Sequence, residues 1–204
     1  NTTYIAKYIQ VEHINYIDEA LRGGKGVIIL AAHLGNWELG GVVVSQLGYP
    51  FWAVALPHTH KKVNSFFNTQ REQKGVNVIP FNKAIRLCLQ VLKENKCLAL
   101  LGDRDFTREG DIKVDFFTVP TSLPKGPAGL CLMTGAPIVP GFMIRNPDDT
   151  FTLRFEKPIM AASSKDTALL PQEQLTRLTL SFKKVMEEYI RRYPDQWYLF
   201  HSSS

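Results

Sequence analysis

A short apolar run, Val-Ile-Ile-Leu at residues 27–30, is followed closely by His33 and Gly35. A helical pattern then occupies residues 39–47. A continuous apolar run of this length is typical of a strand buried on both faces in a parallel sheet. Similar runs occupy residues 51–56, 76–79, 97–101 and 137–144, with helical patterns between most of them. This alternation predicts an α/β fold with a mostly parallel central sheet flanked by helices.

The composition fits one domain with a hydrophobic core. The chain has 204 residues, of which 45% are hydrophobic, so we expect a single domain over residues 1–204. The cysteines lie far apart in apolar stretches without a CxxC motif, which indicates reduced core thiols; they are Cys88, Cys97 and Cys131. The net charge of +5 is compatible with an anionic lipid surface, an acidic carrier protein or nucleic acid, and selects none of them.

His33 is the first candidate for chemistry, because it stands where the strand ends and the helix begins. In open α/β sheets this edge, outside the carboxyl ends of the strands, is where ligands bind. We expect Glu38, in the first helical turn, to hold one imidazole nitrogen while the other accepts a proton. This arrangement has a base and an orienting carboxylate but no protein nucleophile. It therefore predicts that an acceptor substrate attacks a donor substrate directly.

Two further polar segments are expected at the same edge. Asp103, Arg104 and Asp105 follow the apolar run at residues 97–101. Read alone, the two aspartates suggest the metal–nucleotide site of a glycosyltransferase, whereas the arginine suggests a clamp for an anion or a carbonyl. Lys125 and Gly126 begin a predicted helix, whose first backbone N–H groups are suited to an anion.

Several ordered segments resemble a known family. The segment His-Leu-Gly-Asn-Trp-Glu at residues 33–38 resembles the first signature block of the glycerolipid acyltransferase superfamily, and its Asn-Trp-Glu wording is closer to the lipid A lauroyl/myristoyl acyltransferase branch. Further stretches that fit this branch occupy residues 100–105, 114–117, 124–129, 134–140 and 193–198. Arg71 lies in a segment, residues 68–75, that resembles the second block of the family.

The resemblance implies an O-acyltransferase. Such an enzyme moves a fatty acyl chain from a thioester, acyl carrier protein or coenzyme A, to a hydroxyl of a membrane lipid. A lipid A precursor is the first expected acceptor and a phosphatidylinositol mannoside the second. The implied catalytic residues are His33 and Glu38. The implied substrate-binding residues are Arg104, Arg71, Asp103, Asp105, Lys125 and Gly126, and neither a metal nor a cofactor other than the donor is expected.

Members of the resembled branch usually carry an N-terminal hydrophobic segment, which this sequence does not show. We therefore expect a domain without that anchor, in peripheral contact with the cytoplasmic face of the inner membrane, and no nucleic acid as partner. The candidate contacts are Lys61, Lys62, Arg108, Lys113, Arg191 and Arg192, with Trp52, Phe66 and Phe67 as apolar partners. A metal-dependent glycosyltransferase and a lipid-binding module without catalysis remain alternatives.

Overall fold

The computed structural model describes residues 2–57, 59–81, 84–104, 112–162 and 169–198. Its strands are β1 (Ile9–Glu12), β2 (Val27–Ala31), β3 (Phe51–Ala55), β4 (Asn77–Pro80), β5 (Cys97–Leu101), β6 (Ile112–Phe116), β7 (Val119–Leu123), β8 (Ile138–Arg145) and β9 (Phe151–Phe155). Seven of them form one sheet in the order β1-β9-β8-β2-β5-β3-β4, parallel throughout except between β8 and β9. The prediction of an α/β fold with a mostly parallel sheet is confirmed.

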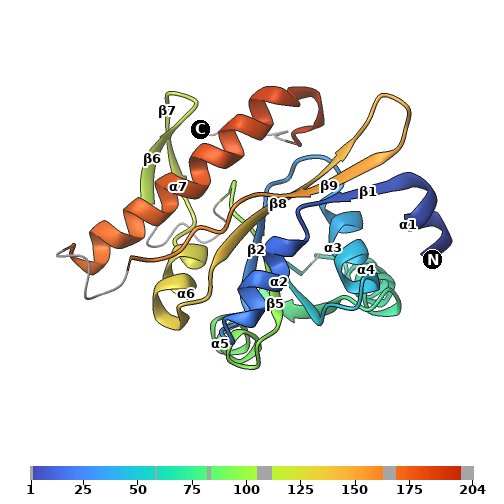
Figure 1. Ribbon diagram of the computed structural model, residues 1–204, viewed down its shortest axis with the longest axis horizontal. Coiled ribbons are helices and arrows are strands. Elements are labelled where there is room, and N and C mark those ends of the chain that lie inside the picture. Colours follow the sequence, from blue (N-terminus) through green and yellow to red (C-terminus); the bar gives the residue numbers. More distant parts are fainter. Residues whose placement is uncertain (1, 58, 82–83, 105–111, 163–168, 199–204) are drawn as a thin grey trace.

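Helices cover both faces of this sheet. They are α1 (Thr2–Tyr8), α2 (Asn15–Arg22), α3 (Trp37–Gln46), α4 (Lys61–Gln73), α5 (Ala84–Lys93), α6 (Gly126–Thr134) and α7 (Pro171–Arg192), followed by the 3₁₀ helix η2 (Pro194–Gln196). Helices α6 and α7 lie on one side of the strands, and α3 and α4 lie on the other (Figure 1). Within the described part of the chain, no helix is both long enough and apolar enough to cross a bilayer.

The alternation of side chains along each strand divides the core into two halves. Leu30, Leu98 and Leu100 face the half that contains α5, α6 and α7. Ile29 and Ala99 face the other half, which contains α2 and α3. Because nearly every residue of β2 and β8 is buried, these central strands read as unbroken apolar runs in the sequence.

Two regions of the fold were not predicted from the sequence. The first is the amino-terminal pair α1 and β1, where β1 adds a parallel edge strand to β9. The second is the hairpin of β6 and β7, of which the sequence predicts only a short strand near residues 112–117 within the loop 102–124. The turn of this hairpin consists of Phe117 and Thr118, both with positive φ (51° and 71°). Such turns normally carry Asn and Gly, so the sequence contains no turn signal here.

Gly35 holds the loop between β2 and α3 against β8. Its φ is +61°, and a Cβ at this position would lie 2.0 Å from the carbonyl oxygen of Met143. The neighbouring Asn36 donates its backbone N–H to that same oxygen at 2.8 Å and caps α3 with its side chain. Only glycine therefore allows this loop to lie so close to the sheet.

We expect Gly35→Ala to destabilise the fold by clearly more than Gly24→Ala. Both glycines have positive φ, which costs an L-residue about 1–2 kcal/mol. A Cβ on Gly24 meets nothing within 4 Å, whereas one on Gly35 meets the Met143 carbonyl. Urea titrations of the two variants measure the difference. Equal losses of unfolding free energy would show that the close approach at Gly35 contributes nothing.

Candidate active site

His33 and Asp103 form the central contact of the site. The Nδ1 atom of His33 lies 2.8 Å from Oδ1 of Asp103, and the backbone N–H of His33 donates to Oδ2 at 3.1 Å. The two residues follow β2 and β5, which are neighbours in the sheet. With Asp103 ionised, the ring carries its proton on Nδ1, so the lone pair of the neutral imidazole is on Nε2.

The charge of Asp103 is stabilised by the protein around it. Its side chain is fully buried, and burial by itself raises the pKa of a carboxyl. Hydrogen bonds from the His33 ring, from the Trp197 indole and from the His33 backbone outweigh burial, so that the pKa of Asp103 lies below its ordinary value of 3.8. Asp103 is therefore a carboxylate at neutral pH, and it orients the imidazole.

The carboxyl-terminal segment lies across this pair. Trp197 donates its Nε1–H to Oδ2 of Asp103 at 3.2 Å. Tyr198 donates its backbone N–H to the His33 carbonyl at 2.8 Å, and Gly35 donates to the Gln196 carbonyl at 2.9 Å. The sequence showed Trp197 only as part of a family-like tail, and nothing local indicated that it would bond to a carboxylate 94 positions away.

The expected partner of His33 was Glu38, and the structure corrects this geometry. Arg71 donates from Nε and Nη2 to the two carboxylate oxygens of Glu38, at 3.0 and 2.5 Å, and from Nη1 to Asn68 at 3.2 Å. The carboxylate on the Nδ1 atom of His33 is that of Asp103 instead. Glu38 and Arg71 thus form a bidentate pair at the wall of the site, and Arg71, expected to bind phosphate, already holds a protein carboxylate.

Arg104 has hydrogen-bonding capacity that no described residue uses. Its Nε and Nη2 atoms are buried and have no hydrogen-bond partner among the described residues. Nε lies 3.9 Å from Oδ2 of Asp103, a separation that gives charge attraction without a hydrogen bond. Leaving buried guanidinium donors unpaired costs free energy, so this arrangement points to a ligand that accepts from them.

A large cavity opens beside these residues. It has a volume of about 1040 Å³ and is lined mainly by apolar side chains from both faces of the sheet. Among its few polar lining residues are His33, Glu38, Arg71, Arg104 and Lys125. Gly126, at the start of α6, lines it as well, and both predicted residues of this helix therefore reach the site. Asp105 and Arg108 lie outside the described residues.

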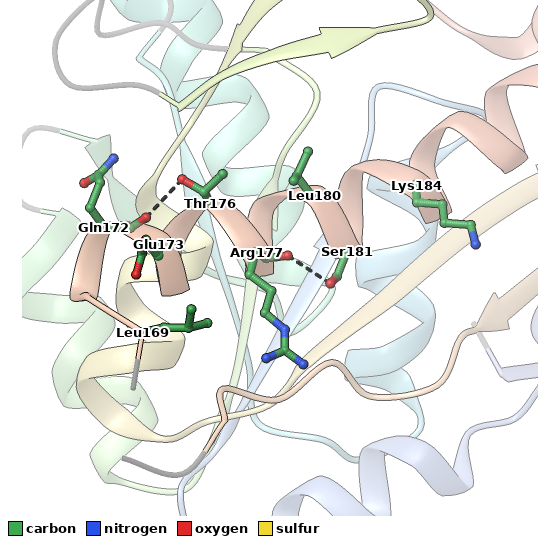
Figure 2. A pocket seen from close by; sticks show the side chains of 8 residues that line it. All are labelled: Leu169, Gln172, Glu173, Thr176, Arg177, Leu180, Ser181 and Lys184. Carbon is green, nitrogen blue, oxygen red and sulfur yellow. Dashed lines mark hydrogen bonds between the residues drawn. The ribbon is translucent and has the colours of Figure 1, made fainter. Parts of the chain in front are cut away.

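A second hollow, along α7, lacks this chemistry. It has a volume of about 590 Å³, and it is lined by Leu169 and by side chains of α7 from Gln172 to Lys184 (Figure 2). Two of its hydroxyls are used within the helix, because Thr176 bonds to the Gln172 carbonyl and Ser181 to the Arg177 carbonyl. The cavity beside His33 is therefore the candidate active site.

Cys88 also lines the cavity, yet it is not suited to be a nucleophile. Burial raises the pKa of its thiol to about 11, so the thiol is protonated at neutral pH. The cysteines Cys88, Cys97 and Cys131 are all buried and free, as predicted.

The geometry also bears on the metal-site alternative. Both oxygens of Asp103 accept hydrogen bonds from protein groups, so this carboxylate is already committed to His33 and Trp197. Among the residues that the structure describes, no three His, Cys, Asp or Glu side chains gather closely enough to hold a metal ion. The metal–nucleotide reading of residues 103–105 thus receives no support from the position of Asp103.

The fold and site define an α/β protein with a histidine–carboxylate pair at the carboxyl edge of its sheet, opening on an apolar cavity. The family model described as bacterial lipid A biosynthesis acyltransferase matches residues 1–203. The chain belongs to this family, as its resemblance implied.

Curated relatives agree with this membership. A phosphatidylinositol mannoside acyltransferase of Mycolicibacterium smegmatis is 30% identical over 96% of this chain and 62% of its own length. Its counterpart in Mycobacterium tuberculosis (strain ATCC 25618 / H37Rv) is 35% identical over 62% of this chain and 41% of its own length. A lipid A biosynthesis palmitoleoyltransferase of Escherichia coli (strain K12) is 24% identical over 97% of this chain and 61% of its own length. The chain thus spans about two to three fifths of the relatives it matches.

We expect Asp103→Asn to lower the unfolding free energy at pH 7 by about 1.5–3 kcal/mol, the range for hydrogen bonds to a charged group. The matched variant Glu38→Gln, in a half-exposed pair, costs less than about 1 kcal/mol. Because the folded pKa of Asp103 is lowered, its contribution is present above the ordinary value of 3.8 and is lost as the pH falls through the folded pKa.

Urea titrations of both variants between pH 7 and pH 3 test this expectation. The gap between the wild type and Asp103→Asn narrows below about pH 4, where the Asp103 carboxyl of the unfolded chain binds a proton while that of the folded protein stays ionised because its pKa is lower. A gap that stays constant to pH 3, or equal losses in the two variants, would contradict the assignment of Asp103 as the buried charged partner of His33.

Proposed function

We propose that this protein is an O-acyltransferase that uses His33 as general base to move a fatty acyl chain from a thioester to a hydroxyl of a membrane lipid. The observation that carries the proposal is the His33–Asp103 pair beside a large apolar cavity. The family membership and the acyltransferase names of the relatives support it. No nucleophilic side chain is required, because the acceptor hydroxyl itself attacks.

The reaction needs two proton transfers at one nitrogen. His33 accepts the proton of the acceptor hydroxyl at Nε2 while Asp103 stabilises the imidazolium through Nδ1–H. The alkoxide oxygen attacks the thioester carbonyl carbon and forms a tetrahedral intermediate. The carbon–sulfur bond then breaks, the thiolate takes the proton from His33, and the acyl chain remains on the acceptor as an ester.

Arg104 is suited to the negative charge that develops in this step. Its buried Nε and Nη2 donors lie next to Asp103 and line the same cavity as His33. We assign them to the carbonyl oxygen of the thioester, or to an acceptor phosphate at the same place. Lys125 and Gly126, at the start of α6, supply a second position for an anionic group of either substrate. Glu38 acts through Arg71, which it positions at the cavity wall.

The acceptor we propose is a phosphorylated membrane glycolipid. The two mycobacterial relatives, named for phosphatidylinositol mannoside, have higher identity to this chain than the Escherichia coli lipid A enzyme. We therefore put a phosphatidylinositol mannoside type of acceptor before a lipid A precursor, which reverses the order expected from residues 33–38. Acyl carrier protein and coenzyme A remain the two candidate donors, and a thiol-release assay with each separates them.

Replacing the general base tests the function directly. We expect His33→Ala to lower the rate of acyl transfer by about 10²–10⁴-fold, because general-base catalysis contributes this much. The measurement is release of free thiol from an acyl thioester in the presence of a membrane lipid extract. His33→Gln serves as the conservative control, and circular dichroism confirms folding. Transfer at the wild-type rate by both variants would refute the proposal, and lipid binding without turnover by the wild type would favour the lipid-binding module.

Helix α4 is the surface that we propose to contact the membrane. It has no buried residue, and its apolar side chains Val63, Phe66 and Phe67 are exposed at helical spacing. The guanidinium of Arg71, which lines the cavity, lies 5.9 Å from the Phe67 ring centre, so this face adjoins the site. Trp52, expected as a further contact, is partly buried and packs against the core.

We expect the double variant Phe66→Ser/Phe67→Ser to bind anionic vesicles several-fold more weakly than the wild type. Lys61→Glu/Lys62→Glu has a similar effect that disappears in high salt, because each lysine near an anionic surface contributes about 1 kcal/mol and is screened. Leu180→Ser, an equally exposed apolar position on α7, is the control. Co-sedimentation that none of these changes alters would exclude α4 as the contact surface.

A further inference from the structure

Residues 196–198 form a strap along the loop that carries His33. The strap runs antiparallel to this loop, and an isolated bridge pairs Trp197 with Leu34. Beside the bridge, the backbone N–H of Tyr198 donates to the His33 carbonyl at 2.8 Å. A segment far away in the sequence therefore holds the main chain of His33 at its carbonyl.

Two other parts of the fold fix the strap in place. The Gln196 side chain accepts from the backbone N–H of Arg145 at 3.0 Å and donates to the carbonyl of the same residue at 2.9 Å. The side-chain amide thus attaches the strap to the end of β8. The ring of Trp197 packs beside Phe116 and Phe117 of the β6–β7 hairpin, with ring centres 6.0 Å apart in both pairs. The indole is therefore held both through its backbone and through its ring.

The indole N–H of Trp197 fixes the orientation of the Asp103 carboxylate. Oδ2 of Asp103 accepts from this N–H at 3.2 Å and from the His33 backbone at 3.1 Å, while Oδ1 lies 2.8 Å from Nδ1 of the His33 ring. A rotation that exchanged the two oxygens would break these contacts together. The plane of the carboxylate is thus set, and the imidazole that bonds to it is held in one orientation.

Tryptophan is chemically suited to this position. Its indole N–H only donates, and it neither ionises nor accepts the proton that Nδ1 of His33 shares with the carboxylate. The side chain of Asp103 is fully buried, so its charge needs donors from the protein. Arg104 adds charge attraction, but its Nε lies 3.9 Å from Oδ2, which is too far for a hydrogen bond. The directional contact on this oxygen from a side chain thus comes from Trp197.

We propose that Trp197 is a positioning residue of acyl transfer, which holds the Asp103 carboxylate and, through it, keeps Nε2 of His33 directed into the cavity. This inference rests on the proposed function, because it concerns the general base of that reaction. Among the residues that the structure describes, Trp197 is not one that lines the cavity. It therefore acts on the rate of the chemical step through Asp103 and not through contact with a substrate.

Trp197→Phe tests this role, because it keeps an aromatic ring beside the hairpin and removes the N–H. We expect kcat to fall by about 10–100-fold, since a misplacement of about 1 Å costs as much as 10²-fold. KM stays the same, because binding of the substrates is not altered. The matched control is Trp52→Phe, a partly buried tryptophan packed against the core, which leaves kcat unchanged. A wild-type kcat in Trp197→Phe would overturn the proposal.

Gln196→Ala tests the strap without changing the indole. It removes both hydrogen bonds to the Arg145 backbone, and we expect kcat to fall several-fold at unchanged KM. This side chain is half-buried, so the variant gives an answer even if Trp197→Phe does not fold. Full kcat in folded Gln196→Ala would contradict a role of the strap in positioning.

A double-mutant cycle separates positioning from packing. Once Asp103→Ala has removed the carboxylate, Trp197→Phe costs little further kcat, because the indole has lost the group through which it acts. An equal loss of kcat with and without the carboxylate would overturn the proposal and leave Trp197 as a packing residue.

The tautomer of His33 gives a readout that requires no turnover. NMR of protein with isotope-labelled histidine distinguishes a proton on Nδ1 from one on Nε2, and His33→Gln identifies the signal. We expect the wild type to carry the proton on Nδ1 and Trp197→Phe to show a mixture of the two forms. If the wild type transfers no acyl chain, the proposed function fails, yet this mixture still supports positioning by Trp197. A pure Nδ1 form in Trp197→Phe overturns it.

Discussion

The site depends on the pairing of β2 with β5. Their register places Ala31 opposite Leu101, and Gly102 continues the ladder by donating its N–H to the Ala31 carbonyl at 2.9 Å. Two residues beyond this last pair, the chains carry His33 and Asp103, so parallel pairing alone delivers the imidazole to the carboxylate. A Cβ on Gly102 would lie 3.0 Å from the Leu30 side chain, so a larger residue here requires that side chain to shift.

The pairing of β2 with β5 also explains which part of the site could be predicted from the sequence. The apolar runs and their spacing predicted the strands, and the position of His33 after the run at residues 27–30 predicted its place at the sheet edge. The order of strands is not contained in this pattern, because alternation alone does not tell whether β2 lies beside β3 or beside β5. Glu38 was therefore expected as the partner of His33, because nothing in the sequence places Asp103, 70 positions away, beside this histidine.

The contacts made by the turn between β6 and β7 could not be predicted from the sequence for a similar reason. Phe117 adopts a positive φ and donates its backbone N–H to Glu187 of α7 at 2.8 Å. The Phe117 ring also packs near the guanidinium of Arg191, at 5.4 Å, and near Trp197. A tertiary contact, and not turn propensity, thus stabilises the hairpin. Through Trp197, which bonds to Asp103, the hairpin and α7 support the carboxylate that orients His33.

The two faces of the central strands differ in the size of their side chains. The face towards α5, α6 and α7 bears large side chains, with Ile28 and Leu30 from β2 and Leu98 and Leu100 from β5. The face towards α3 bears alanines at positions where a Val or Leu would add about 1.5–3 kcal/mol of burial each. A chain selected for stability alone would fill this space, and empty apolar volume is otherwise destabilising. These small residues line the cavity that His33 and Arg104 also line. The unfilled space is therefore part of the site and not a packing defect.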